Sequence, residues 1–129
     1  PDRVDVVGRQ LALAPGGGEL WVANWVGNSV SIIDVSNPDM PVVTATLTPD
    51  HPQDPGRKVL QRPIGISFSP GGDRVWVACA NDDGAGAGHH PPPDGERPPG
   101  SVVIFDRATR GVVAVTEVPF FARFVSFLP

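Results

Sequence analysis

The sequence predicts an all-β fold in which a four-stranded antiparallel sheet is repeated, and two observations lead to that prediction. The first is an internal repeat, because residues 11–24 (LALAPGGGELWVAN) are matched by residues 66–79 (ISFSPGGDRVWVAC) at a constant offset of 55. The second is the content of each copy, which is an apolar run, a Pro-Gly-Gly turn and another apolar run, as in a β-hairpin. Repetition at a few tens of residues is typical of solenoids, propellers and arrays.

The first unit contains four predicted strands. They are expected at residues 11–14, 20–23, 29–33 and 42–47, and the segments between them are rich in Gly, Asn, Asp and Ser, which favour turns. We expect these strands to pair antiparallel in chain order. The short β-prone run at residues 4–7 is expected to be the fourth strand of a preceding unit.

The second unit follows the same order. Its strands are expected at residues 64–69, 74–79, 101–105 and 112–118, and residues 123–129 match the opening strand once more. The predicted organisation is therefore one blade at about 11–47, a second at about 64–118, and the first strand of a third at 123–129.

The predicted strands carry apolar residues on both sides of their alternation, which indicates sheets that are buried on both faces. Repeated four-stranded sheets of this kind are what a β-propeller requires, so the predicted fold is a propeller segment of about two blades with flanking strands. Propellers typically have about four to eight blades. The chain, which begins with Pro1 and not Met, is thus expected to be a fragment of a larger propeller or to assemble with other copies.

The repeated motifs resemble the YVTN-repeat β-propeller family (YVTN/NHL-like repeats). They are an SPGG-type turn, a WVA strand, an SV-I-I-D strand and a later VV strand, and they cover nearly the whole chain outside two long connections. The resemblance implies an extracytoplasmic protein, periplasmic or secreted, that acts as a binding scaffold. Related propellers include lactonases and domains fused to c-type cytochromes, although this sequence lacks the cysteine pair that attaches a haem. Fold alone does not determine activity.

Charge and hydropathy argue against a nucleic-acid partner and against a membrane span. The formal net charge is −4 and no basic block occurs, so nucleic acid is not an expected partner. The longest uncharged stretch near the start, residues 20–33, is too short and too polar to be a membrane span. The single cysteine, Cys79, cannot form an intrachain disulfide and is expected to be a small buried apolar residue.

Two long connections separate the predicted strands, at residues 48–62 and 81–100. In an up-and-down sheet, the turn after the second strand and the turn after the fourth lie on the same face. Both insertions are therefore expected on one face, which we call the insertion face, opposite the short Pro-Gly-Gly turns. Long loops on a rigid scaffold commonly carry binding sites. We predict a non-enzymatic region that binds a protein or small molecule there, the alternative being part of a lactonase-like, metal-dependent hydrolase or oxidoreductase-associated enzyme.

Five residues are candidates for ligand binding on the insertion face. Arg9, Arg62 and Arg123 precede equivalent first strands, and a ring of three arginines at the channel mouth is suited to an anion. The alternative is that they bond neighbouring loops and so cap the blades. Trp25, which has no counterpart in the second unit, is a candidate binding aromatic, and His51 lies in the first insertion.

The second insertion contains residues of metal-ligand type. His89, His90, Asp82 and Asp83 carry imidazole and carboxylate groups, which suit zinc or a similar ion. Their spacing matches no established metal motif, and a solvated, Pro-rich loop is the competing interpretation. No cofactor is predicted, with a metal ion at these four residues as the alternative.

Overall fold

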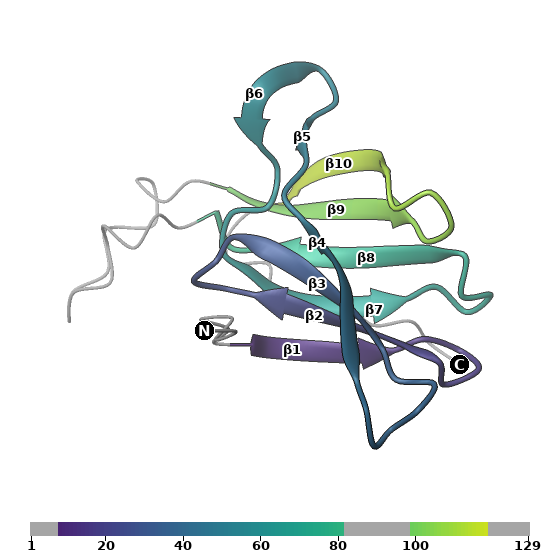
Figure 1. Ribbon diagram of the computed structural model, residues 1–129. Coiled ribbons are helices and arrows are strands. Elements are labelled where there is room, and N and C mark those ends of the chain that lie inside the picture. The colour runs from purple at the N-terminus through teal and green to yellow at the C-terminus, as the bar shows by residue number, and fades with distance from the viewer. Residues whose placement is uncertain (1–7, 82–98, 119–129) are drawn as a thin grey trace.

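The structure is a computed structural model, and it describes residues 8–81 and 99–118. Figure 1 shows two sheets packed against one another, with a small hairpin projecting at the top of the view. No helix occurs in either of these described ranges. The strands are β1 (Gly8–Leu13), β2 (Glu19–Asn24), β3 (Ser29–Asp34), β4 (Val42–Leu47), β5 (Asp50–His51), β6 (Asp54–Lys58), β7 (Pro63–Phe68), β8 (Arg74–Cys79), β9 (Gly100–Asp106) and β10 (Val112–Val118).

Both large sheets are antiparallel and follow chain order. The first is β1-β2-β3-β4 and the second is β7-β8-β9-β10. The all-β prediction and the two four-stranded sheets are therefore confirmed. The predicted strands at residues 4–7 and 123–129 lie outside the described residues.

The core forms between the facing sides of the two sheets. Trp21 of β2 is fully buried, and its ring meets those of Phe68 and Phe105 edge-on, with centroid separations of 6.1 and 6.0 Å. Such edge-to-face contacts add to the stabilisation that comes from burying apolar area. The remaining buried members of this cluster are Val30, Ile32, Val59, Leu60, Ile66, Val75, Val77, Cys79 and Val103.

The repeated Pro-Gly-Gly turns bring the two sheets into close approach. Gly72 has φ +77° and lies against Pro15, so that a Cβ placed on Gly72 would be only 2.8 Å from the proline Cγ. A side chain at position 72 would therefore meet both a backbone penalty and a steric clash. The glycine of the second turn is thus needed for the packing of one blade on the next.

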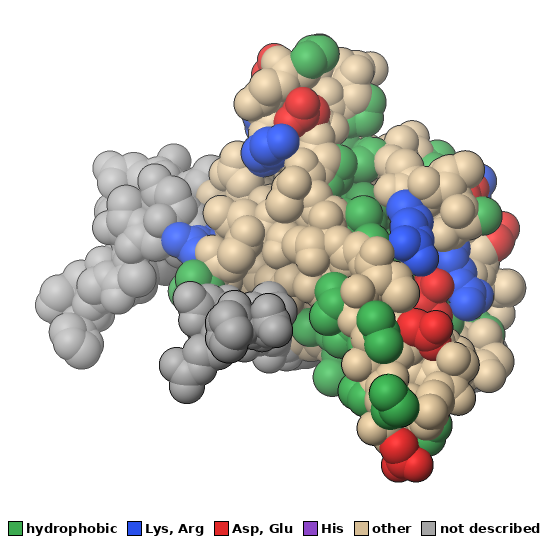
Figure 2. Space-filling view, viewed as in Figure 1, with side chains coloured by type: hydrophobic (Ala, Val, Ile, Leu, Met, Phe, Trp, Pro, Cys, Tyr) green, Lys and Arg blue, Asp and Glu red, His purple; other side chains and the backbone are tan. Residues whose placement is uncertain are grey.

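The outer faces of both sheets are also apolar. Leu11 and Leu13 of β1 alternate with the inward-facing Ala12 and are 60% and 56% exposed. Trp76, the repeat equivalent of Trp21, is only half-buried because it lies on the face of the second sheet that points away from the first. Figure 2 shows hydrophobic side chains gathered over the first sheet.

The first insertion differs from the long loop that the sequence suggested. It contains the β5–β6 hairpin, in which Lys58 Nζ lies 2.7 Å from Asp50 Oδ1 and donates to the Thr48 carbonyl oxygen at 3.0 Å. Val59 and Leu60, which follow the hairpin, are 6% and 1% exposed and belong to the core. The sequence analysis placed Val59 and Leu60 in a loop because turn-forming residues precede them. Only their packing against the two sheets identifies them as core residues.

Cys79 is buried, and burial raises the pKa of its thiol to about 12. The thiolate is the reactive form, so the folded chain at pH 8 should react with iodoacetamide at least tenfold more slowly than the chain in guanidinium chloride. Mass spectrometry of the alkylated fraction over time measures this. Equal rates in the two conditions would contradict the buried position.

The described residues include no helix with the length and apolar character that crossing a membrane requires.

Candidate functional site

The described ends of the two insertions meet at one end of the second sheet, where β7 begins and β8 ends. The backbone N–H of Ala80 donates to the Arg62 carbonyl at 3.0 Å, and that of Asn81 donates to the Gln61 carbonyl at 3.1 Å. The first insertion therefore ends where the second begins. The predicted common face holds for these described ends.

Arg62 and Trp25 come together on this face. The Arg62 guanidinium carbon lies 4.8 Å from the Trp25 ring centroid, and Nη1 donates to the Trp25 carbonyl at 3.3 Å. The Arg62 backbone N–H also donates to Asn28 Oδ1 at 2.8 Å. These contacts join the β2–β3 turn of the first sheet to the start of β7 in the second.

The structure does not test the other predicted arginines and metal ligands. Arg9 lies in β1, and nothing of its side chain is described. The remaining predicted site residues lie outside the described residues; they are Arg123, His89, His90, Asp82 and Asp83. Across residues 8–81 and 99–118, no three His, Cys, Asp or Glu side chains gather as a metal site.

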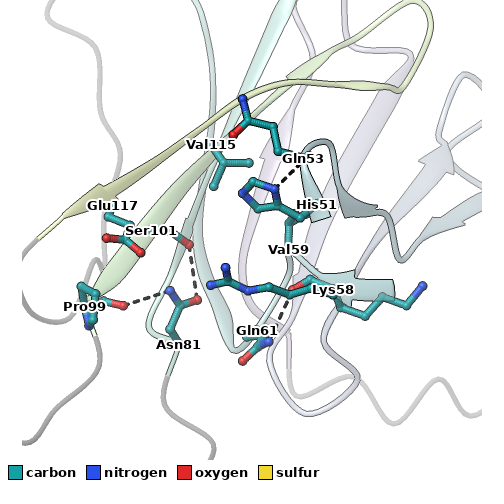
Figure 3. Close-up of a pocket in the computed structure, with 11 residues that line it drawn as sticks. His51, Gln53, Lys58, Val59, Gln61, Asn81, Pro99, Ser101, Val115 and Glu117 are labelled. Carbon is teal, nitrogen blue, oxygen red and sulfur yellow. Dashed lines mark hydrogen bonds between the residues drawn. The ribbon is translucent and has the colours of Figure 1, made fainter. Parts of the chain in front are cut away.

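A cavity of about 340 Å³ opens between the β5–β6 hairpin and strands β9 and β10 (Figure 3). We call it the hairpin cavity. Val59 and Val115 provide apolar surface, while most of its walls are polar. The polar side chains that matter for its chemistry are His51, Gln53, Arg57, Asn81, Ser101 and Glu117.

One wall of the hairpin cavity is held by an internal hydrogen-bond chain. Asn81 Nδ2 donates to the Pro99 carbonyl at 2.9 Å, and Ser101 Oγ donates to Asn81 Oδ1 at 3.3 Å. Asn81 itself has φ +54°, a conformation that asparagine tolerates better than most residues. The amide of Asn81 is therefore occupied in joining the ends of the second insertion.

His51, a residue singled out from the sequence, lines the hairpin cavity. Its Nδ1 accepts the backbone N–H of Gln53 at 3.1 Å. A neutral imidazole whose Nδ1 is an acceptor carries its proton on Nε2. His51 therefore has an Nε2–H donor that no described residue uses.

Sequence reasoning missed Arg57 and Glu117. Arg57 belongs to β6 and Glu117 to β10, and both line the hairpin cavity. Within the described part of the chain neither has an ion-pair partner. No motif in the sequence marks them, because only the folding of the hairpin over β10 places them on the same cavity.

The opposite face carries an open depression of about 480 Å³ between the two sheets. Glu19 lines it, with Oε1 3.4 Å from Arg107 Nε and Oε2 3.7 Å from Arg110 Nη2. Trp21 Nε1 also donates to Glu19 Oε1 at 2.6 Å. We call this cluster the Glu19 latch, because the Glu19 carboxylate pairs with both arginines and so joins β2 to the β9–β10 turn.

Asp106 borders the same depression. The backbone N–H of Thr109, which donates to Asp106 Oδ1 at 2.9 Å, is the main reason that the pKa of this carboxyl lies below its ordinary value, and Arg74 contributes further. A lowered pKa stabilises the fold above the ordinary value near 3.8 and loses that contribution as pH falls below it. Asp106 is thus charged and already bonded, which leaves the hairpin cavity as the better candidate for a ligand.

No protein-family model matches the chain, and no curated protein matches it. Among solved structures, Kuenenia stuttgartiensis hydrazine synthase is similar with TM-score 0.62 and 18% identity, over 91% of this chain and 25% of that one. A hypothetical selenium-binding protein from Sulfolobus tokodaii has TM-score 0.59 and 20% identity, over 95% and 30%. The chain thus spans less than a third of the length of each. Together with the two stacked four-stranded sheets, these similarities show a β-propeller fold.

Proposed function

We propose that this chain is a non-enzymatic propeller segment that binds a small molecule in the hairpin cavity. The observation that carries the proposal is a cavity on the insertion face whose walls hold polar groups that bond no described residue. These are His51 Nε2–H, the Arg57 guanidinium and the Glu117 carboxylate. Concave sites with a few converging polar groups over apolar surface are typical of small-molecule binding.

The proposal also includes membership of the YVTN-repeat family and a location outside the cytoplasm. Membership of the YVTN-repeat family is supported by the SPGG turn and the WVA strand. An extracytoplasmic location, periplasmic or secreted, follows from that resemblance.

The proposal extends to partners on the outer sheet faces, which are further propeller blades or other copies of the chain. Leu11 and Leu13, which are exposed on the outer face of the first sheet, support it. Contiguous exposed apolar surface of this kind favours a covering partner.

A cavity-filling substitution tests the binding proposal. Gln53→Trp places a large ring on the rim of the hairpin cavity, whereas Asp54→Trp places the same ring on the neighbouring exposed residue, which does not line it. Saturation-transfer NMR with a defined mixture of amino acids, sugar acids and nucleotides should show at least one member binding the wild type and Asp54→Trp. Gln53→Trp should lose that signal. Binding by none of the mixture, or equal binding by all three proteins, would contradict the proposal.

The enzyme alternative has one observation in its favour, since His51 and Glu117 are residues of general acid–base type on the same cavity. Opening of δ-gluconolactone, followed by pH indicator, separates the two proposals. Under the binding proposal the wild type leaves the uncatalysed rate unchanged. Turnover that disappears in His51→Gln would instead establish the enzyme.

A further inference from the structure

The polar groups of the hairpin cavity divide into those already bonded and those that are not. Asn81 and Ser101 bond one another, and Asn81 also bonds Pro99. Lys58 is turned away from the cavity, as Figure 3 shows, because its ammonium group is held by Asp50 and by a backbone carbonyl. Its charge is therefore compensated within the hairpin.

The charged groups that bond no residue in the described ranges have opposite signs and lie on facing elements. Arg57 and the Nε2–H of His51 are donors on the hairpin side, and the Glu117 carboxylate is an acceptor on β10. Arg57 and Glu117 do not pair with each other across the cavity, nor with any other described residue. A ligand that enters here meets one positive and one negative group.

These charges decide the class of ligand. A ligand with a single charge would satisfy one group and bring its own charge towards the like charge of the other. A molecule with a carboxylate at one end and an ammonium at the other satisfies both. The guanidinium fork matches carboxylate geometry, with His51 as an additional donor, and the ammonium donates to Glu117.

We propose that the hairpin cavity binds a small zwitterion of the amino-acid class, with its carboxylate at Arg57 and His51 and its ammonium at Glu117. This inference rests on the proposed binding function. The cavity volume of about 340 Å³ lies near the lower end of the range for ligand pockets, roughly 300–1,000 Å³, which fits a ligand of this size. Val59 and Val115 offer apolar contact to the carbon chain between the two charges.

Both charged side chains are exposed to solvent, so salt screens them. Binding should therefore weaken as ionic strength rises, and titrations belong at low salt. The comparison that matters is between ligands that differ in one charge.

The test is a titration of the wild type with a series of amino acids of increasing chain length, namely glycine, 4-aminobutyrate and 6-aminohexanoate. Butyrate and butylamine are the singly charged controls. Chemical-shift titration should show at least one zwitterion binding about tenfold or more tightly than either control, as expected for one added charge-assisted hydrogen bond. Arg57→Gln and Glu117→Gln should each remove that advantage. Asp54→Asn, which changes the net charge by the same amount as Glu117→Gln at a residue that does not line the cavity, should keep it.

Two results would overturn the inference and leave the binding function standing. One is that butyrate or butylamine binds as tightly as the zwitterions, and the other is that Arg57→Gln and Glu117→Gln leave zwitterion affinity unchanged. In both cases another member of the mixture still binds and loses its signal in Gln53→Trp. Absence of all binding in the cavity would overturn the inference together with the proposed function.

Discussion

Replacing Trp21 by alanine should lower the free energy of unfolding by about 3–5 kcal/mol, the range typical for large-to-small changes of a buried aromatic residue. Trp21 is 0% exposed and lies between Phe68 and Phe105 of the other sheet. Its loss removes apolar burial and both edge-to-face contacts, and it leaves a cavity where the sheets meet. Urea unfolding followed by circular dichroism measures the change.

The matched control is Trp76→Ala, which changes the equivalent residue of the second repeat. Trp76 is half-buried, so less area returns to water and the loss should be less than half that of Trp21→Ala. Equal losses for the two variants would mean that the outer face of the second sheet is covered as fully as the inner one. For a sample that is monomeric by size-exclusion chromatography, that result would contradict the burial difference on which the comparison depends; for an assembled sample it would instead support the covering copy proposed above.

Removing the carboxylate of the Glu19 latch by Glu19→Ala should cost about 1–3 kcal/mol of stability, the usual penalty for a buried polar group that loses its partner. The buried Trp21 N–H loses its acceptor, and Arg107 and Arg110 lose the group that they share. The same urea experiment measures the effect. Asp39→Ala, at an exposed turn, should change stability by no more than about 0.5 kcal/mol.

A second variant separates the two functions of Glu19. Glu19→Gln keeps an oxygen that can accept the Trp21 N–H while removing the charge, so it should recover most of the stability lost in Glu19→Ala. Partly exposed ion pairs are each worth little, which is why the indole contact is expected to dominate. If glutamine is as harmful as alanine, the two arginine pairs carry the effect instead.

Much of the candidate site was invisible to sequence reasoning for a physical reason. His51 could be singled out because histidines are few and all three lie in the two insertions. Arg57 and Glu117 could not, because a charged residue in a loop or at the solvent-facing position of a strand is usually just solvated. Their significance comes from proximity between β6 and β10, which are far apart in the chain.

The sequence by itself determined the all-β fold and the order of its two sheets. Those features follow from short-range chemistry, namely Pro-Gly-Gly turns between apolar runs and their repetition at a constant spacing. Only the tertiary structure decided that Val59 and Leu60 anchor the first insertion in the core, that Arg62 stacks on Trp25, and which groups share the hairpin cavity. Such contacts join segments distant in sequence, and their energy depends on geometry that no local pattern encodes.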